Sequence, residues 1–327
     1  MGAWEEIVDY TVPSNTTSVV LDNFGTITKD DFIKIHANIK NPSTSAGINI
    51  SLFPNADTNN SNYYLQQLQA NGSSVSAVRA NQNGLTRVEP NIDASIFSYL
   101  KISENEKVNL FSNDFAQNNN LLRTKYLYTT STSTFNNINQ FTLTSNISNT
   151  LGAGSRIQIY RLTAQKVADI TVASNTTQVD IAGLDIKKGD EYLLVSDMVS
   201  SGSSNSQINL CVNNNTNLSG YFRQVIVASG GGTGAERVNR AEITTLIQNA
   251  RSLGYSHIKL SNIGAYTSQS YGMRRMGETI LELENNSVSS TAENITSITQ
   301  LNLFSSVSNA IGSGTRFQLY KLYEGGN

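Results

Sequence analysis

The sequence has few charged residues, and the charges that it has nearly cancel. Asp, Glu, Lys and Arg make up 15% of its 327 residues, and the formal net charge is -2 at pH 7. Nucleic acids and anionic membrane surfaces attract proteins through a field of basic residues, which this composition does not supply. We therefore expect neither nucleic acid nor a membrane as a partner.

Cysteine and long apolar runs are also scarce. A single cysteine, Cys211, excludes an internal disulfide framework. No stretch approaches the roughly 20 apolar residues of a membrane span, and the start MGAWEEIVDY has no basic region followed by an apolar run. The sequence predicts a chain made in the cytosol without a signal peptide and stabilised by packing alone.

Polar turn residues and short apolar alternations are what the sequence has in abundance. Hydrophobic residues make up 38% of the chain, which argues against disorder. Between Ile33 and Lys40, apolar and polar residues alternate as they do in a strand with one wet face. Such strands, joined by Asn/Ser/Gly turns without βαβ alternation, predict an all-β protein of antiparallel sandwiches, with a jelly roll as the preferred topology.

An internal repeat organises the chain. TVPSNTTSVVL from Thr11 returns as TVASNTTQVDI from Thr171, and GAGSRIQIYRL from Gly152 returns as GSGTRFQLYKL from Gly312, both at an offset of 160 residues. The length suits two domains of about 160 residues, each able to bury its own core. We expect two copies of one sandwich, at residues 1–163 and 164–327.

The same offset aligns strand patterns between these two ends. It maps the apolar residues of the strand from Ile33 onto Leu193, Val195, Asp197 and Val199, of which all but Asp197 are apolar. It maps those of the strand from Ile48 onto Ile208, Leu210 and Val212. Tyr63-Tyr64 match Tyr221-Phe222 only when the offset changes by two.

The middle of the second copy predicts a helix. From Asn239 to Leu253, apolar residues recur at helical spacing, and Gly254 follows them; the residues are Ile243, Leu246, Ile247, Ala250 and Leu253. We interpret Arg237 to Leu253 as an insertion that contains an amphipathic helix. The first copy has a weak equivalent at Ile92 to Leu100, where helix and strand are equally supported.

Glycine pairs precede the last strand of both copies, at Gly152 and Gly154 and again at Gly312 and Gly314. A turn that needs a positive φ or a close backbone approach explains them.

The sequence offers little for catalysis. Only His36 and His257 could serve as histidine bases, and no partner is suggested for either. Cys211 has no neighbouring histidine or second cysteine, so it supports neither a thiol nucleophile nor a metal site. We predict no cofactor and no metal.

Two further patterns have structural explanations. The glycine-rich run from Ser229 to Gly234 is not followed by the Lys-Ser/Thr of a phosphate loop, so it predicts a flexible loop. Acidic residues that could form a glycosidase pair are spread over turns, which favours solvated charges; they are Asp30, Asp31, Glu104 and Glu106. The sequence therefore predicts a non-enzymatic protein.

Residues with a large contact area at low entropic cost are the candidates for an interface. They are the aromatic pairs, one tyrosine in each closing strand and two apolar residues of the predicted helix: Tyr63, Tyr64, Tyr160, Tyr221, Phe222, Leu246, Ile247 and Tyr320. Burial inside each domain is the alternative for Tyr160 and Tyr320. We expect a homo-oligomer, with a trimer favoured.

The ends of both copies resemble a sandwich module of tailed-bacteriophage virion proteins. The resemblance is carried by the closing strand GSGTRFQLYKL, the opening TVASNTTQVDIAGL and the Asn-rich strand with a following aromatic at Gln207 to Phe222. It implies a structural virion protein that contacts other virion proteins, namely a capsid decoration or head-fibre-associated protein. The alternatives are a tail-tip or baseplate protein that binds a host receptor or glycan and, third, a polysaccharide-cleaving enzyme.

Overall fold

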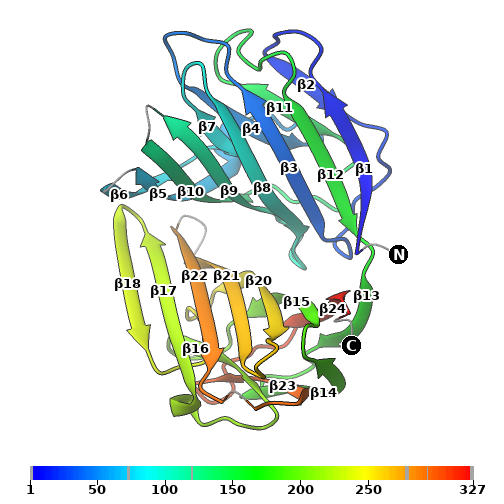
Figure 1. Cartoon of the computed structure of the whole chain (residues 1–327), viewed down its shortest axis with the longest axis vertical. Helices are drawn as coiled ribbons and strands as arrows, with labels where there is room; N and C mark the ends of the chain where they lie inside the picture. Colours follow the sequence, from blue (N-terminus) through cyan, green and yellow to red (C-terminus); the bar gives the residue numbers. More distant parts are fainter. Residues whose placement is uncertain (1–2, 72–73, 119–120, 277–279, 293, 325–327) are drawn as a thin grey trace. The chain divides into compact units, whose positions relative to one another are not determined.

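The computed structural model describes residues 3–71, 74–118, 121–276, 280–292 and 294–324 (Figure 1). In these ranges the regular elements are β-strands and two short 3-10 turns, with no α-helix. None of the described segments is a helix that could cross a membrane. The chain divides into two compact units at Thr163 and Ala164.

The first domain is formed by twelve strands in two sheets. They are β1 (Trp4–Thr11), β2 (Ser18–Leu21), β3 (Ile33–Lys40), β4 (Ile48–Pro54), β5 (Tyr63–Asn71), β6 (Ser74–Ala80), β7 (Thr86–Val88), β8 (Asp93–Ile102), β9 (Val108–Asn118), β10 (Leu121–Ser131), β11 (Phe141–Ser145) and β12 (Arg156–Leu162). The larger sheet has the order β1-β12-β3-β8-β9-β10-β5-β6, and the smaller has the order β2-β11-β4-β7.

The second domain repeats this arrangement strand for strand. Its strands are β13 (Gln165–Thr171), β14 (Gln178–Lys187), β15 (Glu191–Val199), β16 (Ser206–Val212), β17 (Tyr221–Ser229), β18 (Gly232–Val238), β19 (Glu242–Leu246), β20 (Arg251–Leu260), β21 (Tyr266–Met276), β22 (Ile280–Ser290), β23 (Ser297–Ser305) and β24 (Arg316–Tyr323). The orders are β13-β24-β15-β20-β21-β22-β17-β18 and β14-β23-β16-β19.

Each domain is a jelly roll with two additional hairpins. In the first domain, β1-β12-β3-β8 packs on β2-β11-β4-β7, which is the strand order of an eight-stranded roll. The hairpins β5–β6 and β9–β10 extend the larger sheet beyond this roll. The predicted all-β class, the two antiparallel sandwiches and their internal repeat are therefore confirmed.

Both cores lie between the two sheets, as the alternation of the strands requires. In the first domain, Ile35 and Ile159 of the larger sheet pack with Leu143 of the smaller one, and all three are fully buried. In the second domain, Leu194 and Leu319 lie in the equivalent core. The apolar strand faces that the sequence pattern indicates are therefore the faces that pack against each other.

The offset between the copies is not constant along the chain. Ile159 opposes Ile35 in the first domain, and Leu319 opposes Leu194 in the second, so β3 and β15 correspond at an offset of 159. The predicted match of Ile35 to Val195 is wrong by one residue. Because a slip of one residue exchanges the two faces of a strand, Val195 lies on the face opposite to Leu194.

Relative to the first copy, the second copy has lost one more residue between β15 and β16. Leu143 opposes Leu52 and Leu303 opposes Leu210, so β4 and β16 correspond at an offset of 158. Ile48 and Ile208 lie in equivalent strands, as predicted, but their registers differ by two. The changed offset at Tyr63 and Tyr221 therefore begins earlier in the chain, in the loops around β3 and β15.

The predicted helix from Arg237 to Leu253 is wrong. Glu242–Leu246 and Arg251–Leu260 are strands β19 and β20, which correspond to β7 and β8, so there is no insertion. Strand β19 is buried on both faces and does not alternate, and a turn with Asn249 at φ 55° follows it. A strand buried on both faces, followed by a turn, produced apolar spacing that matched a helix. Ile92 to Leu100 lies mostly in strand β8.

The glycine pairs have the predicted role. Gly154 and Gly314 adopt φ values of 79° and 83°, which an L side chain strains to reach. A Cβ atom on Gly152 would lie 2.8 Å from the carbonyl oxygen of Lys40 in β3, and one on Gly312 would lie 2.9 Å from that of Val199 in β15. These positions require glycine in both copies.

Candidate functional site

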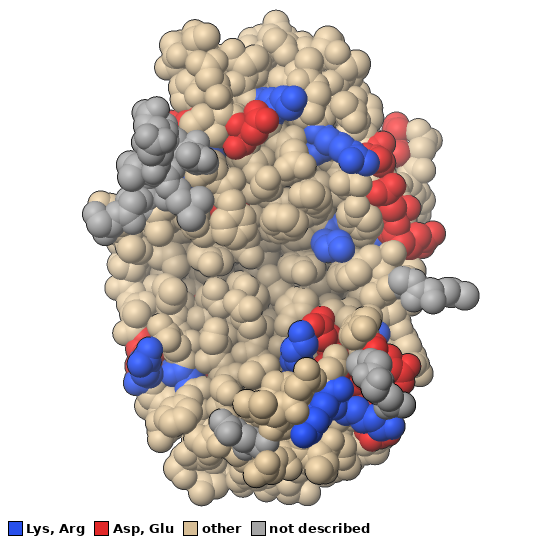
Figure 2. All heavy atoms as spheres, in the orientation of Figure 1, with Lys and Arg blue, Asp and Glu red and all other residues tan. Residues whose placement is uncertain are grey.

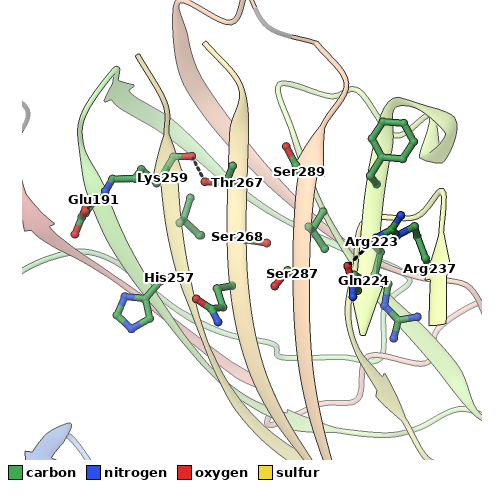
Figure 3. Close-up of a pocket in the computed structure, with 14 residues that line it drawn as sticks. Glu191, Arg223, Gln224, Arg237, His257, Lys259, Thr267, Ser268, Ser287 and Ser289 are labelled. Carbon is green, nitrogen blue, oxygen red and sulfur yellow. Dashed lines mark hydrogen bonds and ion pairs between the residues drawn. The ribbon is translucent and has the colours of Figure 1, made fainter. Parts of the chain in front are cut away.

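A groove with a volume of about 750 Å³ lies on the outer face of the larger sheet of the second domain (Figure 3). Strands β15, β20, β21, β22, β17 and β18 contribute its lining, and these strands are consecutive in the sheet. The side chains that face it include Glu191, His257, Lys259, Thr267, Gln269, Ser287, Ser289, Phe222, Gln224 and Arg237. The groove therefore crosses the strands instead of following one of them.

Strand alternation places these side chains on one face. In β21, Thr267 and Gln269 reach the groove, whereas Ser270 between the sheets pairs with Ser256 of β20. In β22, Ser287 lies in the groove, and its neighbour Asn286 is buried on the core side. Successive residues of a strand point to opposite faces, so the same segments build both core and groove.

Small side chains form the floor of the groove. Gln269 opposes Ser287 across β21 and β22, and the equivalent pair in the first domain is Phe111 and Tyr128. The two aromatic rings are buried, with centroids 4.8 Å apart, and the Tyr128 hydroxyl donates to Asn109. Replacing two rings by an amide and a hydroxyl opens space in the second domain.

One end of the groove carries an ion pair. Lys259 Nζ contacts a Glu191 carboxylate oxygen, and Thr267 Oγ1 donates to the Lys259 carbonyl oxygen at 3.4 Å. Burial lowers the pKa of His257, while the Glu191 charge acts in the opposite direction. The imidazole is therefore neutral at pH 7 and offers one donor and one acceptor.

The other end combines an aromatic ring with a guanidinium group. Phe222 exposes 53% of its surface, and Arg237 Nη2 donates to Gln224 Oε1 at 3.4 Å. In Figure 3, Gln224 and Arg237 lie on the opposite side of the groove from Glu191 and His257. The site is thus aromatic and cationic at one end and polar along its floor.

Arg223 lies behind this end, and acidic and amide groups hold it. Its Nη1 atom is 3.1 Å from Glu242 Oε2 and 3.0 Å from Glu236 Oε2, and its Nε atom donates to Asn286 Oδ1 at 2.8 Å. The side chain is 3% exposed. Arg223 therefore belongs to the interior of the domain, although it touches the groove.

The described residues contain no group of three or more His, Cys, Asp or Glu side chains that could hold a metal ion. In the groove, the carboxylate of Glu191 pairs with Lys259. What the lining offers chemically is hydrogen bonding, the aromatic surface of Phe222 and the exposed guanidinium group of Arg237.

The eight predicted interface residues occupy different environments. Phe222 lies in the groove, and Tyr64 and Tyr160 are half-buried. The remaining five are buried within the chain, which gives them a role in packing; they are Tyr63, Tyr221, Leu246, Ile247 and Tyr320. Tyr221, for example, accepts a hydrogen bond from Val212 N at 3.1 Å and donates to Asn215 O at 3.0 Å.

The three residues that were considered for catalysis lie in different places. His36 stacks on Phe97 in the first domain, with ring centroids 4.6 Å apart. Cys211 is fully buried, and burial raises the pKa of its thiol to about 11. His257 lies within β20 and lines the groove.

Sequence reasoning missed most of the groove. Gln224, Arg237, Gln269 and Ser287 were not singled out, because each is an ordinary polar residue on the wet face of a strand. The available signal was the comparison of the copies, in which Ser287 replaces Tyr128 and Gln269 replaces Phe111.

The fold and the groove define a tandem jelly-roll protein with a lined surface site on one domain. No family model matches the chain, and no curated protein does. Among solved structures, domains LG4-5 of the mouse laminin alpha1 chain match at 8% sequence identity, covering 97% of this chain and 90% of that chain. The TM-score is 0.19, and a likeness at this level carries no argument about fold or function.

Proposed function

We propose that the chain is a non-enzymatic adhesive protein whose second domain binds a glycan chain in the groove across its larger sheet. The observation that carries this proposal is the groove itself, a hollow of about 750 Å³ with hydrogen-bonding side chains and an exposed aromatic ring. Binding sites for small molecules are typically concave surfaces that combine apolar area with a few placed polar groups.

The length of the groove favours an extended ligand. From β15 to β18 the lining strands span five gaps between neighbours. At roughly 4.8 Å for each gap, the groove is about 24 Å long. This length suits several linked sugar units better than one compact molecule.

The chemistry of the lining suits sugars. Gln224, Gln269 and Ser287 carry groups that both donate and accept hydrogen bonds, which is what sugar hydroxyl groups require. The exposed ring of Phe222 offers a flat apolar surface to the C–H face of a pyranose ring. Figure 2 shows a face of the molecule on which most side chains are uncharged.

Glycan binding is tested by screening the purified chain on a glycan array and measuring hits by titration calorimetry. Phe222→Ala removes the aromatic surface and should weaken binding at least tenfold, about 1.4 kcal/mol. Phe115→Ala is the matched control, because Phe115 is 42% exposed and belongs to the first domain. Binding to no glycan on the array would refute the proposal, and equal losses in both variants would remove the groove as the site.

The virion setting is proposed on the resemblance of the sequence to phage sandwich modules. In this setting the glycan-binding protein is a tail adhesin, and the second candidate is a capsid decoration or head-fibre protein that forms a homo-oligomer. The exposed rings of Phe97 and Phe115 in the first domain offer such a protein contact area with neighbours.

Copy number separates the two candidates, because a capsid lattice repeats one binding site over its surface and a tail tip offers one ring. Quantitative mass spectrometry of intact particles should find a few copies of an adhesin. An amount similar to that of the major capsid protein would favour decoration, and absence from particles would refute the virion setting.

A further inference from the structure

We propose that the glycan carries an acidic sugar, whose carboxylate binds the guanidinium group of Arg237 at the β17–β18 end of the groove. This inference rests on the proposed glycan binding, and it adds the charge of the ligand and the residue that selects for it. Its basis is the way in which the charges of the groove are paired.

The other cations of the groove already have carboxylate partners. Lys259 pairs with Glu191, and Arg223 contacts Glu236 and Glu242 at 3.0 and 3.1 Å. Among the residues that the structure describes, no carboxylate lies within ion-pairing distance of Arg237. Among the described residues, Arg237 is therefore the cation of the groove that has no carboxylate partner, and it lies at one end.

The position of Arg237 suits a ligand that lies on Phe222. Arg237 is exposed on β18, next to Gln224 of β17, whose amide oxygen accepts a hydrogen bond from Nη2. Phe222 and Gln224 point to the same face, because they are two residues apart in one strand. A sugar ring on Phe222 would place its substituent near the guanidinium group.

A guanidinium group is well suited to a carboxylate. It has five N–H donors in a planar fork, and two of them bind both oxygens of a carboxylate. The hydrogen bond to Gln224 uses Nη2 and leaves donors of Arg237 for a ligand.

The first domain has the same arginine–glutamine pair without the groove. Arg79 Nε donates to Gln66 Oε1 at 3.3 Å on the equivalent strands. There, however, Phe111 and Tyr128 occupy the positions of the groove floor. Selection for an acidic sugar is therefore expected of the second domain, where the cation and the hollow occur together.

The test compares oligogalacturonate with galacto-oligosaccharide of equal length, titrated into the full chain by calorimetry. We expect the acidic oligomer to bind at least tenfold more tightly at low salt, with a preference that shrinks as salt screens the charges. Arg237→Gln should remove the preference, so that the acidic and the neutral oligomer bind with similar affinity.

Two further variants sharpen the test. Arg237→Lys keeps the charge but not the bidentate geometry, so it should retain part of the preference. Arg156→Gln is the control, because it removes the same charge from a half-exposed arginine of the first domain. It should leave both affinities unchanged.

The outcomes distinguish this inference from the proposed function. Equal binding of the two oligomers, or a preference that survives in Arg237→Gln, overturns selection by Arg237 while glycan binding stands. Failure to bind any glycan overturns the proposed function and this inference with it.

Discussion

The two domains share every strand, yet they differ in what they place at equivalent positions of the larger sheet. On the outer face, the first domain has Phe111 and Tyr128 where the second has Gln269 and Ser287. In the first domain two rings packed at a tilt fill this position, and in the second domain a groove is left. A repeated fold thus acquires a site through the size of side chains, with its hydrogen-bonded framework unchanged.

The buried charges differ as well. In the first domain, Asp114 accepts a hydrogen bond from Thr86 and lies between the buried cations Arg123 and Lys125. In the second domain, buried Arg223 is the cation, and Glu242 and Glu284 are its buried carboxylate partners. Lys125 and Glu284 occupy equivalent positions with opposite charge.

The changes between the domains compensate one another. Leu65 stands at the position of Arg223, and Gly84 precedes Thr86 as Glu242 precedes Thr244. A side chain on Gly84 would collide with Leu65, so this leucine requires a glycine, as Arg223 requires a carboxylate. Each domain therefore has its own set of matching buried residues. Replacing one of them by its equivalent from the other domain should lower the free energy of unfolding.

The largest expected loss of stability comes from removing Arg223 from the buried set of the second domain. Arg223→Leu removes the buried cation that Glu242 and Glu284 share, although Arg240 stays 3.6 Å from Glu242, and it should lower the free energy of unfolding by about 3–5 kcal/mol. The measurement is urea denaturation of the full chain. Adding Glu242→Gly, which copies Leu65 and Gly84 of the first domain, should recover part of the loss. A single variant as stable as the unchanged chain would refute the interpretation of compensated partners.

The buried lysine of the first domain predicts a pH effect of similar or smaller size. Burial lowers the pKa of Lys125 to about 8, although Asp114 acts in the opposite direction. Between pH 8 and about 10.4 the unfolded state binds more protons at this group, so its contribution to stability rises with pH. The gain is at most about 3 kcal/mol, because one pKa unit corresponds to about 1.4 kcal/mol.

Lys125→Met isolates this contribution. The unfolding free energy of the unchanged chain, relative to the variant, should increase from pH 8 to 10 and stay level from pH 6 to 7.5. Parallel curves over the whole range would contradict a depressed pKa for Lys125.

The smallest expected loss of unfolding free energy should be the same in both domains. Ser98 and Ser112 form a buried hydroxyl pair at 2.8 Å, and Ser256 and Ser270 form its equivalent at 2.8 Å. Ser98→Ala and Ser256→Ala should each cost about 1 kcal/mol of unfolding free energy, since each leaves one partner without this hydrogen bond. If the two losses differ by more than about 1 kcal/mol, the serine pair does not contribute equally to the stability of the two domains.

The sequence by itself determined the all-β class, the repeat and the glycine turns, because these depend on local patterns. The motif from Thr11 and the pair Gly152 and Gly154 return in the second copy, and their structural roles need no distant partner. Alternation from Ile33 likewise identified β3.

Only the tertiary structure decided the register of β15, the strand at Glu242 and the groove. One-residue losses in loops exchange the faces of a strand, and no local pattern shows in which loop they occur. The strand at Glu242 is buried on both faces by elements distant in sequence, which hides its period. The groove joins side chains of six strands, from Glu191 to Ser289, and its depth depends on which small residues the sheet brings side by side.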